Sequence, residues 1–430
     1  MRKVLAPVWL LLALLGGGAW GQSLPPVRIG DQPGFTRVVL DLPKEATYTI
    51  EPLGAALRVT LPNQTVPPGI HFVTLPELTG YVMEQFEDRA VLILLTPQGV
   101  TARSGFKTMI LAALEGDGQR LVIDLSGAFV DTSPLPGASG FRFVKANGRR
   151  FSVVVDAGHG GSDPGAVGPV VEKAVNLEVA LRVRRLLQDA GVEVTMTREG
   201  DTAFSLDKRT DLTQRIAVAE GKNLFVSIHA NAMVPAHADG WCGLEVYYFG
   251  PRNIRPFFPP PAPLEPTPQL ALTPSPLDAL STTTQTGGLP TLPGYPALPG
   301  YPALTGYPAL PGNEPDVLPS SEDRKALPPQ NLPTPTPQMN LLRRMELSRT
   351  LATRVVSYML GATAALNRGV RVSDFFVLRY TTVPAILVEM GYLSHPVEGL
   401  NLRNAHYLDR ISYGIARGVL EYLENDDPLE

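Results

Sequence analysis

Phe151-Ser-Val-Val-Val155 runs directly into Asp156-Ala-Gly-His-Gly-Gly-Ser-Asp-Pro-Gly-Ala166, and this stretch decides the fold of the second half of the chain. Its first residues have the apolar, β-branched composition of a buried strand, and its glycines allow a sharp turn. Apolar residues at helical spacing from Val175 to Ala190, followed by Gly191, then predict a helix closed by a glycine. Strand, glycine-rich turn and amphipathic helix in this order indicate an α/β domain.

The same alternation continues towards the C-terminus. The sequence predicts strands at 192–197, 224–228, 243–249 and 385–388, and helices at 206–220, 341–360 and 404–423. Such alternation predicts an open, mainly parallel sheet with helices on both faces. In sheets of this kind the chemistry gathers beyond the carboxyl ends of the strands.

Prolines interrupt this domain. The chain has 430 residues and 43 prolines, and the segment 251–338 is rich in proline and carries a six-residue repeat that starts at Gly294, Gly300 and Gly306. Proline removes backbone donors and fixes φ, so we predict a disordered or polyproline-like insertion within a domain of residues 151–424. A tolerated spacer and a docking site for a proline-binding partner both fit this composition.

A different pattern precedes Phe151. Short alternating runs at 36–42, 56–61, 90–95 and 120–125, separated by Gly, Pro, Asn and Asp, predict a small all-β sandwich over residues 27–129. Residues 130–150 have the composition of a linker.

The N-terminus has the layout of a secretory signal peptide. Arg2 and Lys3 precede an apolar run over 4–15, and small residues lead up to Gly21, so we predict a signal peptide over residues 1–21. The alternative is an uncleaved anchor, but the run is shorter than the roughly 20 residues that span a bilayer. No later stretch is long and apolar enough to span, so we expect an exported, soluble protein of the periplasm or cell envelope.

Composition excludes several classes of function. A net charge of −4 without a basic block argues against nucleic acid as a partner. A single cysteine, Cys242, excludes a disulfide framework and a zinc site built on thiolates. Six histidines are left as nitrogen ligands for a metal.

Four polar residues stand beside the predicted strand ends or the first helix. His159 and His229 follow predicted strands, Glu172 precedes the first helix, and Glu389 follows the strand at 385–388. Two histidines and a carboxylate are a standard ligand set for catalytic zinc, and a second carboxylate can take a proton from water. Loop residues with ordinary hydrogen bonds are the alternative.

The ordered motifs decide between these interpretations. Asp156-Ala-Gly-His-Gly-Gly, Glu172-Lys, Ser227-Ile-His-Ala-Asn and Val388-Glu-Met-Gly-Tyr-Leu-Ser resemble those of the zinc-dependent N-acetylmuramoyl-L-alanine amidases, the amidase type 3 family. The resemblance covers nearly all of residues 151–423 outside the proline-rich segment. The β region is similar to the AMIN domain, which in relatives is associated with binding the wall or localising the enzyme.

The resemblance implies a role for each of the four residues. It assigns one zinc ion per catalytic domain to His159, Glu172 and His229, and it makes Glu389 the catalytic carboxylate. The implied reaction is hydrolysis of the amide between N-acetylmuramic acid and the L-alanine of the stem peptide. Peptidoglycan is therefore the expected partner, with an activator protein as a further one. The proline-rich segment lacks an apolar helical stripe, so we do not expect a docked helix to block the site.

Two other functions fit the same residues. A zinc peptidase that cuts within the stem peptide would use similar metal chemistry, and a protein of this fold without catalysis would bind the wall only. The remaining polar residues carry weaker hypotheses. Asp156, Asp163 and Asn231 are expected to support the ligands or to cap the backbone locally, and Cys242 is expected to be a buried, unreactive thiol. Trp241 is a candidate for the border of a substrate groove. Surface or structural roles are expected for His237, His395 and His406.

Overall fold

The computed structural model describes residues 22–135 except residue 25, residues 150–250 and residues 341–425. The predicted signal peptide, most of the predicted linker and the whole proline-rich segment lie outside the described residues.

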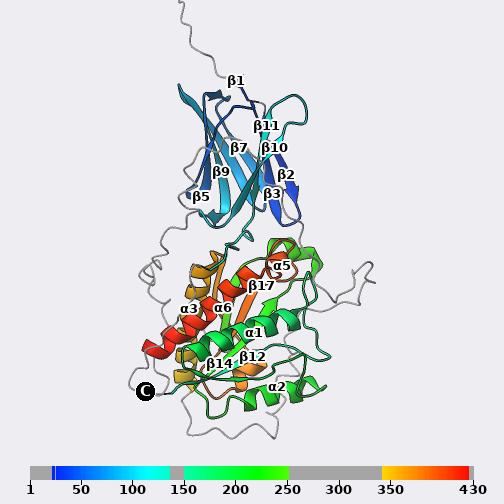
Figure 1. The fold of residues 1–430 in the computed structure, drawn as a ribbon, viewed down its shortest axis with the longest axis vertical. Coiled ribbons are helices and arrows are strands. Elements are labelled where there is room, and N and C mark those ends of the chain that lie inside the picture. The colour runs from blue at the N-terminus through cyan, green and yellow to red at the C-terminus, as the bar shows by residue number, and fades with distance from the viewer. Residues whose placement is uncertain (1–21, 25, 136–149, 251–340, 426–430) are drawn as a thin grey trace, which may run out of the picture.

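Two antiparallel sheets form the N-terminal part of the chain, at the top of Figure 1. The four-stranded sheet has the order β10-β11-β3-β2, with β2 (Arg28–Gln32), β3 (Phe35–Leu42), β10 (Phe106–Ala112) and β11 (Gln119–Leu125). The five-stranded sheet has the order β4-β5-β9-β8-β7, with β4 (Thr49–Pro52), β5 (Gly54–Pro62), β7 (Gly69–Leu75), β8 (Leu78–Gln85) and β9 (Arg89–Val100). Two short strands, β1 (Gln22–Ser23) and β6 (Gln64–Thr65), pair with each other.

The two sheets pack face to face around one core. Val38 and Ile123 from the first sheet and Leu57 and Leu94 from the second are fully buried in it. Alternate residues of each strand point inward, as the period-two pattern of the sequence requires. The predicted all-β region is therefore confirmed.

A six-stranded sheet with the order β13-β12-β14-β17-β15-β16 organises the second part of the chain. Its strands are β12 (Ser152–Ala157), β13 (Glu193–Met196), β14 (Leu224–Asn231), β15 (Leu244–Phe249), β16 (Asn367–Ser373) and β17 (Ala385–Tyr392). The first four strands in this order are parallel, whereas β15 is antiparallel to β17 and parallel to β16.

The sheet is therefore mixed, and the prediction of a mainly parallel sheet is confirmed only in part. The connection from β14 to β15 contains a 3₁₀ helix, η2 (Pro235–Gly240), and no α-helix that crosses back over the sheet. Parallel neighbours need such a crossover. Without it, β15 starts at the edge where β14 ends and runs in the opposite direction.

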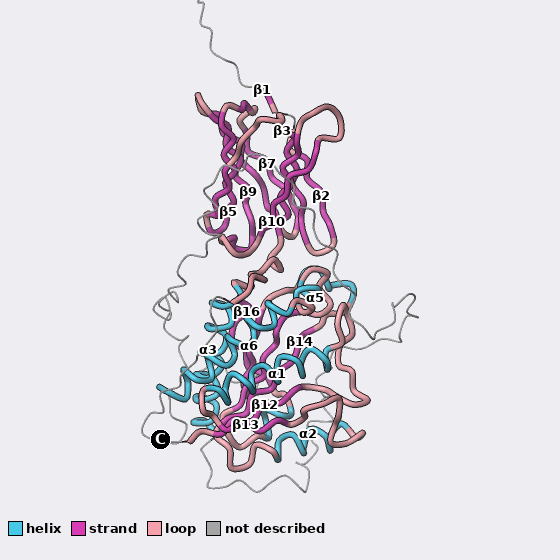
Figure 2. Tube along the Cα trace, in the orientation of Figure 1, coloured by secondary structure: helices cyan, strands magenta, loops and turns pink. Residues whose placement is uncertain are grey.

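Helices cover both faces of this sheet. On one face lie α1 (Glu172–Asp189), α3 (Leu341–Thr363) and α6 (Ala405–Asn425), which Figure 2 shows side by side with α6 in the middle. On the other face lie α2 (Lys208–Ala217) and α4 (Phe376–Tyr380), and the short α5 (Glu398–Asn401) follows β17. Helices on both faces agree with the prediction. In the described part of the chain, no helix is long and apolar enough to cross a membrane.

Gly250, which precedes the undescribed segment 251–340, lies close to the first turns of α3, which follow it. A Cβ atom added to Gly250 would lie 3.5 Å from the methyl carbon of Met345, in the first turns of α3. Ser348 of α3 accepts a hydrogen bond from the backbone N–H of Ala385, the first residue of β17. Both ends therefore lie at the amino end of β17, opposite the end that carries Glu389.

The β region packs directly on the α/β domain. Asp131 forms ion pairs with Arg103 of the β region, at 3.1 Å, and with Arg410 of α6, at 3.2 Å. Asn401 of α5 donates a hydrogen bond of 2.8 Å to the carbonyl oxygen of Ala128. Asp131 and Val130, the first residues of the predicted linker, are buried in this contact.

Candidate active site

His229 and Glu389 lie next to each other on neighbouring strands. They are register partners in the parallel pair β14 and β17, and Glu245 of β15 is the antiparallel partner of Glu389. Register partners share one face of a sheet, so the three side chains form a row on the face covered by α2 and α4. The sequence predicts His229 and Glu389 just after their strands, whereas both lie inside them.

His159, Glu172 and His229 converge into one cluster. The Nε2 atom of His159 lies 3.2 Å from Oε1 of Glu172, and Nδ1 of His229 lies 3.0 Å from the same oxygen. One ligand atom from each residue lies within 4.8 Å of the others. Glu172, expected just before the first helix, is the first residue of α1.

Glycines make room for the cluster. A Cβ atom at Gly158 would lie 2.2 Å from Nε2 of His229, and one at Gly165 would lie 2.5 Å from Oε2 of Glu172. Real Cβ atoms do not come so close to other atoms, so a side chain at either position would displace a member of the cluster. His159 itself has a φ of 62°, a left-handed conformation that is uncommon outside glycine.

Hydrogen bonds orient the three side chains. Asp163 lies 2.9 Å from Nδ1 of His159, and Lys208 of α2 donates to Asp163 at 2.5 Å. Asn176 of α1 donates to Oε1 of Glu172 at 3.2 Å. A carboxylate behind a histidine ring fixes both its tautomer and its orientation. Asp163, a weak candidate in the sequence, therefore directly supports His159.

The carboxylates favour positive charge in the cluster. Burial opposes protonation of His159, but its hydrogen bonds with Asp163 and Glu172, together with their charges, raise its pKa to about 9. Burial also opposes ionisation of Glu172, yet the two imidazoles hold the pKa of this carboxyl well below its usual range. The electrostatics of the cluster therefore suit a cation.

A buried ion pair fixes the backbone around His159. Asp156 is almost fully buried and accepts hydrogen bonds from Ser227 at 2.6 Å, Thr197 at 2.7 Å and Arg215 at 2.9 Å. Arg215 also donates to the carbonyl oxygen of His159 at 2.7 Å. Asp156 thus acts on the cluster through Arg215 and through the backbone.

Arg198 is a residue that the sequence analysis missed. Its guanidinium donates to the carbonyl oxygens of Ala157 at 2.8 Å, Gly158 at 2.9 Å and Lys173 at 2.6 Å. It therefore joins the glycine-rich turn to the first turn of α1. The only signal in the sequence is a cationic residue directly after a predicted strand, which could equally be exposed.

Glu245 was also missed, although its position on β15 places it beside Glu389. It is buried and accepts hydrogen bonds from the hydroxyl groups of Tyr247 and, at 2.6 Å, of Tyr392. Nε of Arg371 lies 3.4 Å from the same carboxylate. The row on the sheet therefore continues past Glu389 into a polar network.

The other residues named from the sequence lie outside the cluster. Cys242 is buried, and burial followed by the charge of Glu398 raises the pKa of its thiol, which keeps it protonated and unreactive. His395 is fully buried, and its Nδ1 accepts the backbone N–H of Glu398, so its role is structural. Trp241 is partly exposed and stacks with Arg368, whose guanidinium carbon lies 4.5 Å from the ring centroid.

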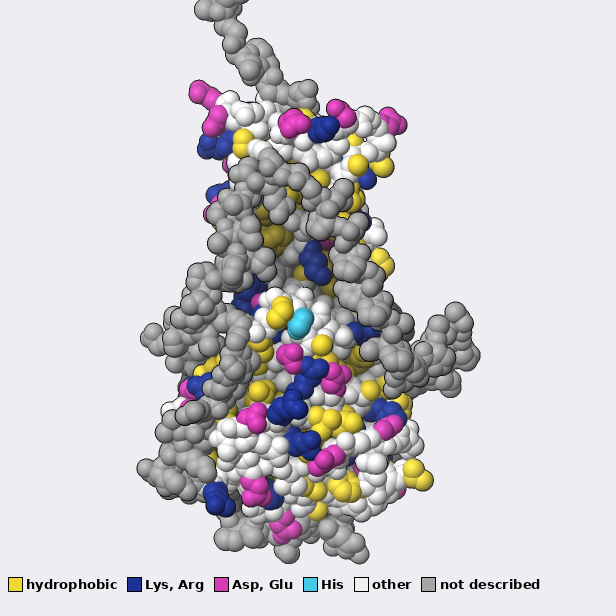
Figure 3. All heavy atoms as spheres, viewed as in Figure 1, with side chains coloured by type: hydrophobic (Ala, Val, Ile, Leu, Met, Phe, Trp, Pro, Cys, Tyr) yellow, Lys and Arg dark blue, Asp and Glu magenta, His cyan; other side chains and the backbone are white. Residues whose placement is uncertain are grey.

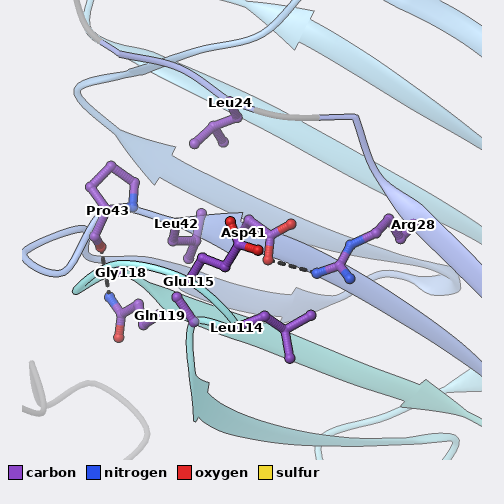
Figure 4. Close-up of a pocket in the computed structure, with 10 residues that line it drawn as sticks. Leu24, Arg28, Asp41, Leu42, Pro43, Leu114, Glu115, Gly118 and Gln119 are labelled. Atoms are coloured by element: carbon purple, nitrogen blue, oxygen red, sulfur yellow. Dashed lines mark hydrogen bonds and ion pairs between the residues drawn. The ribbon is translucent and has the colours of Figure 1, made fainter.

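The surface offers other hollows and charges. Figure 4 shows a hollow in the β region where Arg28 and Asp41 pair with each other at 2.6 Å, so these two charges are already matched. The face shown in Figure 3 carries acidic and basic side chains side by side. The cluster of His159, Glu172 and His229 is therefore the strongest candidate for a functional site.

The fold and the cluster define an α/β protein with a candidate site for a single metal ion. Residues 153–421 match the profile of the N-acetylmuramoyl-L-alanine amidase family, and the chain belongs to this family.

Individual relatives share parts of the chain. The germination-specific N-acetylmuramoyl-L-alanine amidase of Bacillus subtilis (strain 168) is 43% identical over 109 residues, which are 23% of this chain and 45% of the relative. N-acetylmuramoyl-L-alanine amidase AmiC of Neisseria meningitidis serogroup B (strain ATCC BAA-335 / MC58) is 29% identical over 300 residues, 68% of this chain and 56% of the relative. The chain thus spans about half the length of these two proteins.

The solved catalytic domain of CwlV, an N-acetylmuramoyl-L-alanine amidase from Bacillus (Paenibacillus) polymyxa var. colistinus, is similar as well. It is 27% identical with a TM-score of 0.38, and the match covers 64% of this chain and 98% of that domain.

Proposed function

We propose that this chain is a zinc-dependent peptidoglycan amidase that hydrolyses the amide between N-acetylmuramic acid and the L-alanine of the stem peptide. The observation that carries the proposal is the convergence of His159, Glu172 and His229 beside Glu389 in a member of this family. Peptidoglycan is the proposed substrate, and an activator protein is a further proposed partner. Export to the periplasm or cell envelope and a wall-binding role for the AMIN-like β region belong to the same proposal.

The cluster fits a zinc ion in its donor atoms and in its space. Two imidazole nitrogens and one carboxylate oxygen are the set that catalytic zinc takes, with a position left for water. The structure points one nitrogen of each histidine at Oε1 of Glu172, and Gly158 and Gly165 keep the surroundings clear. His159, Glu172 and His229 would hold the ion.

In the proposed hydrolysis, zinc and Glu389 have different roles. Zinc, when bound, lowers the pKa of water and polarises a carbonyl oxygen. Glu389, the register partner of His229 on the neighbouring strand, accepts the proton of the attacking water. It then passes this proton to the nitrogen of L-alanine, which leaves as an amine.

Mass spectrometry of digested peptidoglycan tests the reaction. Purified wall is incubated with the protein, with and without a zinc chelator. We expect free stem peptides and intact glycan chains only without the chelator. Fragments cut inside the stem peptide would instead show a zinc peptidase, and the absence of products would show a binding protein.

Variants of the site separate metal binding from proton transfer. Glu389→Gln should retain zinc and lose activity by about 10²-fold to 10⁴-fold, because an amide cannot accept the proton of water. His229→Ala should lose both zinc and activity, since it removes a ligand. Zinc content is measured by elemental analysis and activity by release of stem peptides.

A control comes from an exposed glutamate of the same sheet. Glu193 of β13 pairs only with Lys222, at 2.7 Å, among the described residues, and Glu193→Gln should leave both zinc and activity unchanged. Normal turnover by zinc-loaded Glu389→Gln would overturn the role of Glu389.

A further inference from the structure

The row of side chains on the sheet extends beyond Glu389. Across β14, β17, β15 and β16 the register partners are His229, Glu389, Glu245 and, at the far end, Gly369. Neighbouring strands are about 4.8 Å apart, so the row reaches roughly 10 Å past Glu389. A Cβ atom added to Gly369 would meet no atom within 4 Å, so the space beside this end of the row is open.

Glu245 is a buried carboxylate within this row. Only 1% of its side chain is exposed, and the hydroxyl groups of Tyr247 and Tyr392 both donate to it. A buried carboxylate costs free energy unless hydrogen bonds and an opposite charge compensate it. The carboxylate therefore requires a cation next to it, and Arg371 supplies one.

Arg371 approaches Glu245 through its Nε atom. It lies on β16 as the register partner of Tyr247, and its Nε is 3.4 Å from Oε2 of Glu245. Its side chain is 42% exposed, and Glu245 is its only ion-pair partner among the described residues. A guanidinium carries five N–H donors, so this exposed group can bind a ligand beside the open space at Gly369.

We propose that Arg371 binds a carboxylate of the stem peptide on the leaving-group side of the scissile amide, an inference that rests on the proposed function. The residue that follows L-alanine in the stem peptide bears a carboxyl group that can be free or amidated. A peptide chain spans at most about 3.6 Å per residue, so this group can reach the carboxylate of Glu245, one strand beyond Glu389, which Nε of Arg371 contacts. Arginine binds carboxylates through two parallel hydrogen bonds, which an amide cannot form in the same way.

The test compares two synthetic muramyl peptides that differ only at this carboxyl group. For the wild-type protein, kcat/KM should be about tenfold or more higher for the free carboxylate than for the amide, as one charge-assisted contact implies. Arg371→Gln should abolish this preference. Arg371→Lys keeps the charge but loses the planar fork, and it should keep part of the preference.

The ratio of the two substrates is the decisive readout. Any general effect of Arg371→Gln on Glu245, on Glu389 or on folding changes both rates equally and leaves the ratio unaltered. Arg379→Gln is the matched control, because Arg379 is 43% exposed and pairs with Asp374 at 2.9 Å, and it should preserve the wild-type ratio.

Three outcomes would overturn the proposal. The first is a wild-type protein that cleaves both substrates equally well, and the second is an Arg371→Gln variant that keeps the full preference for the acid. The third is a wild-type protein that cleaves neither substrate, which would also overturn the proposed function. The first two outcomes leave the proposed function intact.

Discussion

At the scale of single residues, the cluster of His159, Glu172 and His229 depends on glycines as well as on its own side chains. The carbonyl oxygen of Gly158 accepts hydrogen bonds from Arg198 and Asn176. The ring of His229 occupies the space that a Cβ atom of residue 158 would need. Gly158 lies between the end of β12 and His159. Its role is therefore steric, and it can be tested without removing a ligand.

Gly158→Ala should weaken zinc binding by about 10-fold to 100-fold, because the added methyl group would sit 2.2 Å from Nε2 of His229 and displace the ring. Competition with a chelator measures the affinity. Gly200→Ala is the control, since a Cβ atom there meets nothing within 4 Å. Equal zinc affinities of the two variants would contradict the steric role.

The four residues assigned by resemblance could be found in the sequence because each stands in a motif beside a recognisable strand or helix. Their supporting residues could not be found in the same way. Arg198, Arg215 and Glu245 act through contacts with segments distant in the sequence, and a buried charge has no local signature. Such partners emerge only from tertiary packing.

At the scale of elements, five of the six strands of the α/β sheet were predictable, but strand length and direction were not. The apolar runs of β14 and β17 stop before His229 and Glu389, so the pattern suggests a loop there. The ladder continues because neighbouring strands satisfy the backbone whatever the side chain is. The direction of β15 follows from its connection to β14. The sequence analysis does not predict β16 and α4, because their residues lack a strong hydrophobic period.

The buried ion pair that joins α2 to β12 should be costly to break. Arg215→Met leaves Asp156 as an uncompensated buried charge, and we expect a loss of about 3–5 kcal/mol in the free energy of unfolding. Chemical denaturation measures this loss. Lys222→Met breaks an exposed pair with Glu193 and should leave the free energy of unfolding nearly unchanged. Similar losses for both variants would show that the buried pair contributes nothing special.

At the scale of the whole molecule, the segment that follows β17 also contacts the β region. A Cβ atom at Gly34, between β2 and β3, would lie 3.0 Å from the ring of His395, which follows β17. Glu398 is fully buried beside this contact and accepts the backbone N–H groups of Tyr392 at 2.7 Å and Gly243 at 2.9 Å. The sandwich was predictable from alternating residues, whereas this docking was not, because it rests on scattered single contacts.

Glu398 should make the stability of the protein depend on pH. Burial raises its pKa to about 8 from its usual 4.5, although two N–H groups oppose the shift. Between these values the folded protein keeps a proton that the unfolded chain releases, so the free energy of unfolding falls as pH rises from about 4.5 to about 8. Glu398→Gln mimics the protonated group and should remove this part of the slope.

Denaturation at pH 5 and pH 8, with a chelator present throughout, tests this expectation. The gain of Glu398→Gln relative to wild type should be larger at pH 8, with a limiting slope of about 1.4 kcal/mol per pH unit. Glu77, whose burial raises its pKa to about 7, adds a slope of the same sign that both proteins share. Exposed Glu220→Gln serves as the reference, and a pH-independent difference for Glu398→Gln would refute the linkage.

The closeness of Gly250 to Met345 has a practical consequence. Chain segments that lie close together, at the end of the sheet away from Glu389, are a suitable place to insert another folded domain. A fluorescent reporter exchanged for residues 251–340 would join the domain near the amino end of β17, away from Glu389. The protein could then be followed by a label that lies away from the candidate site.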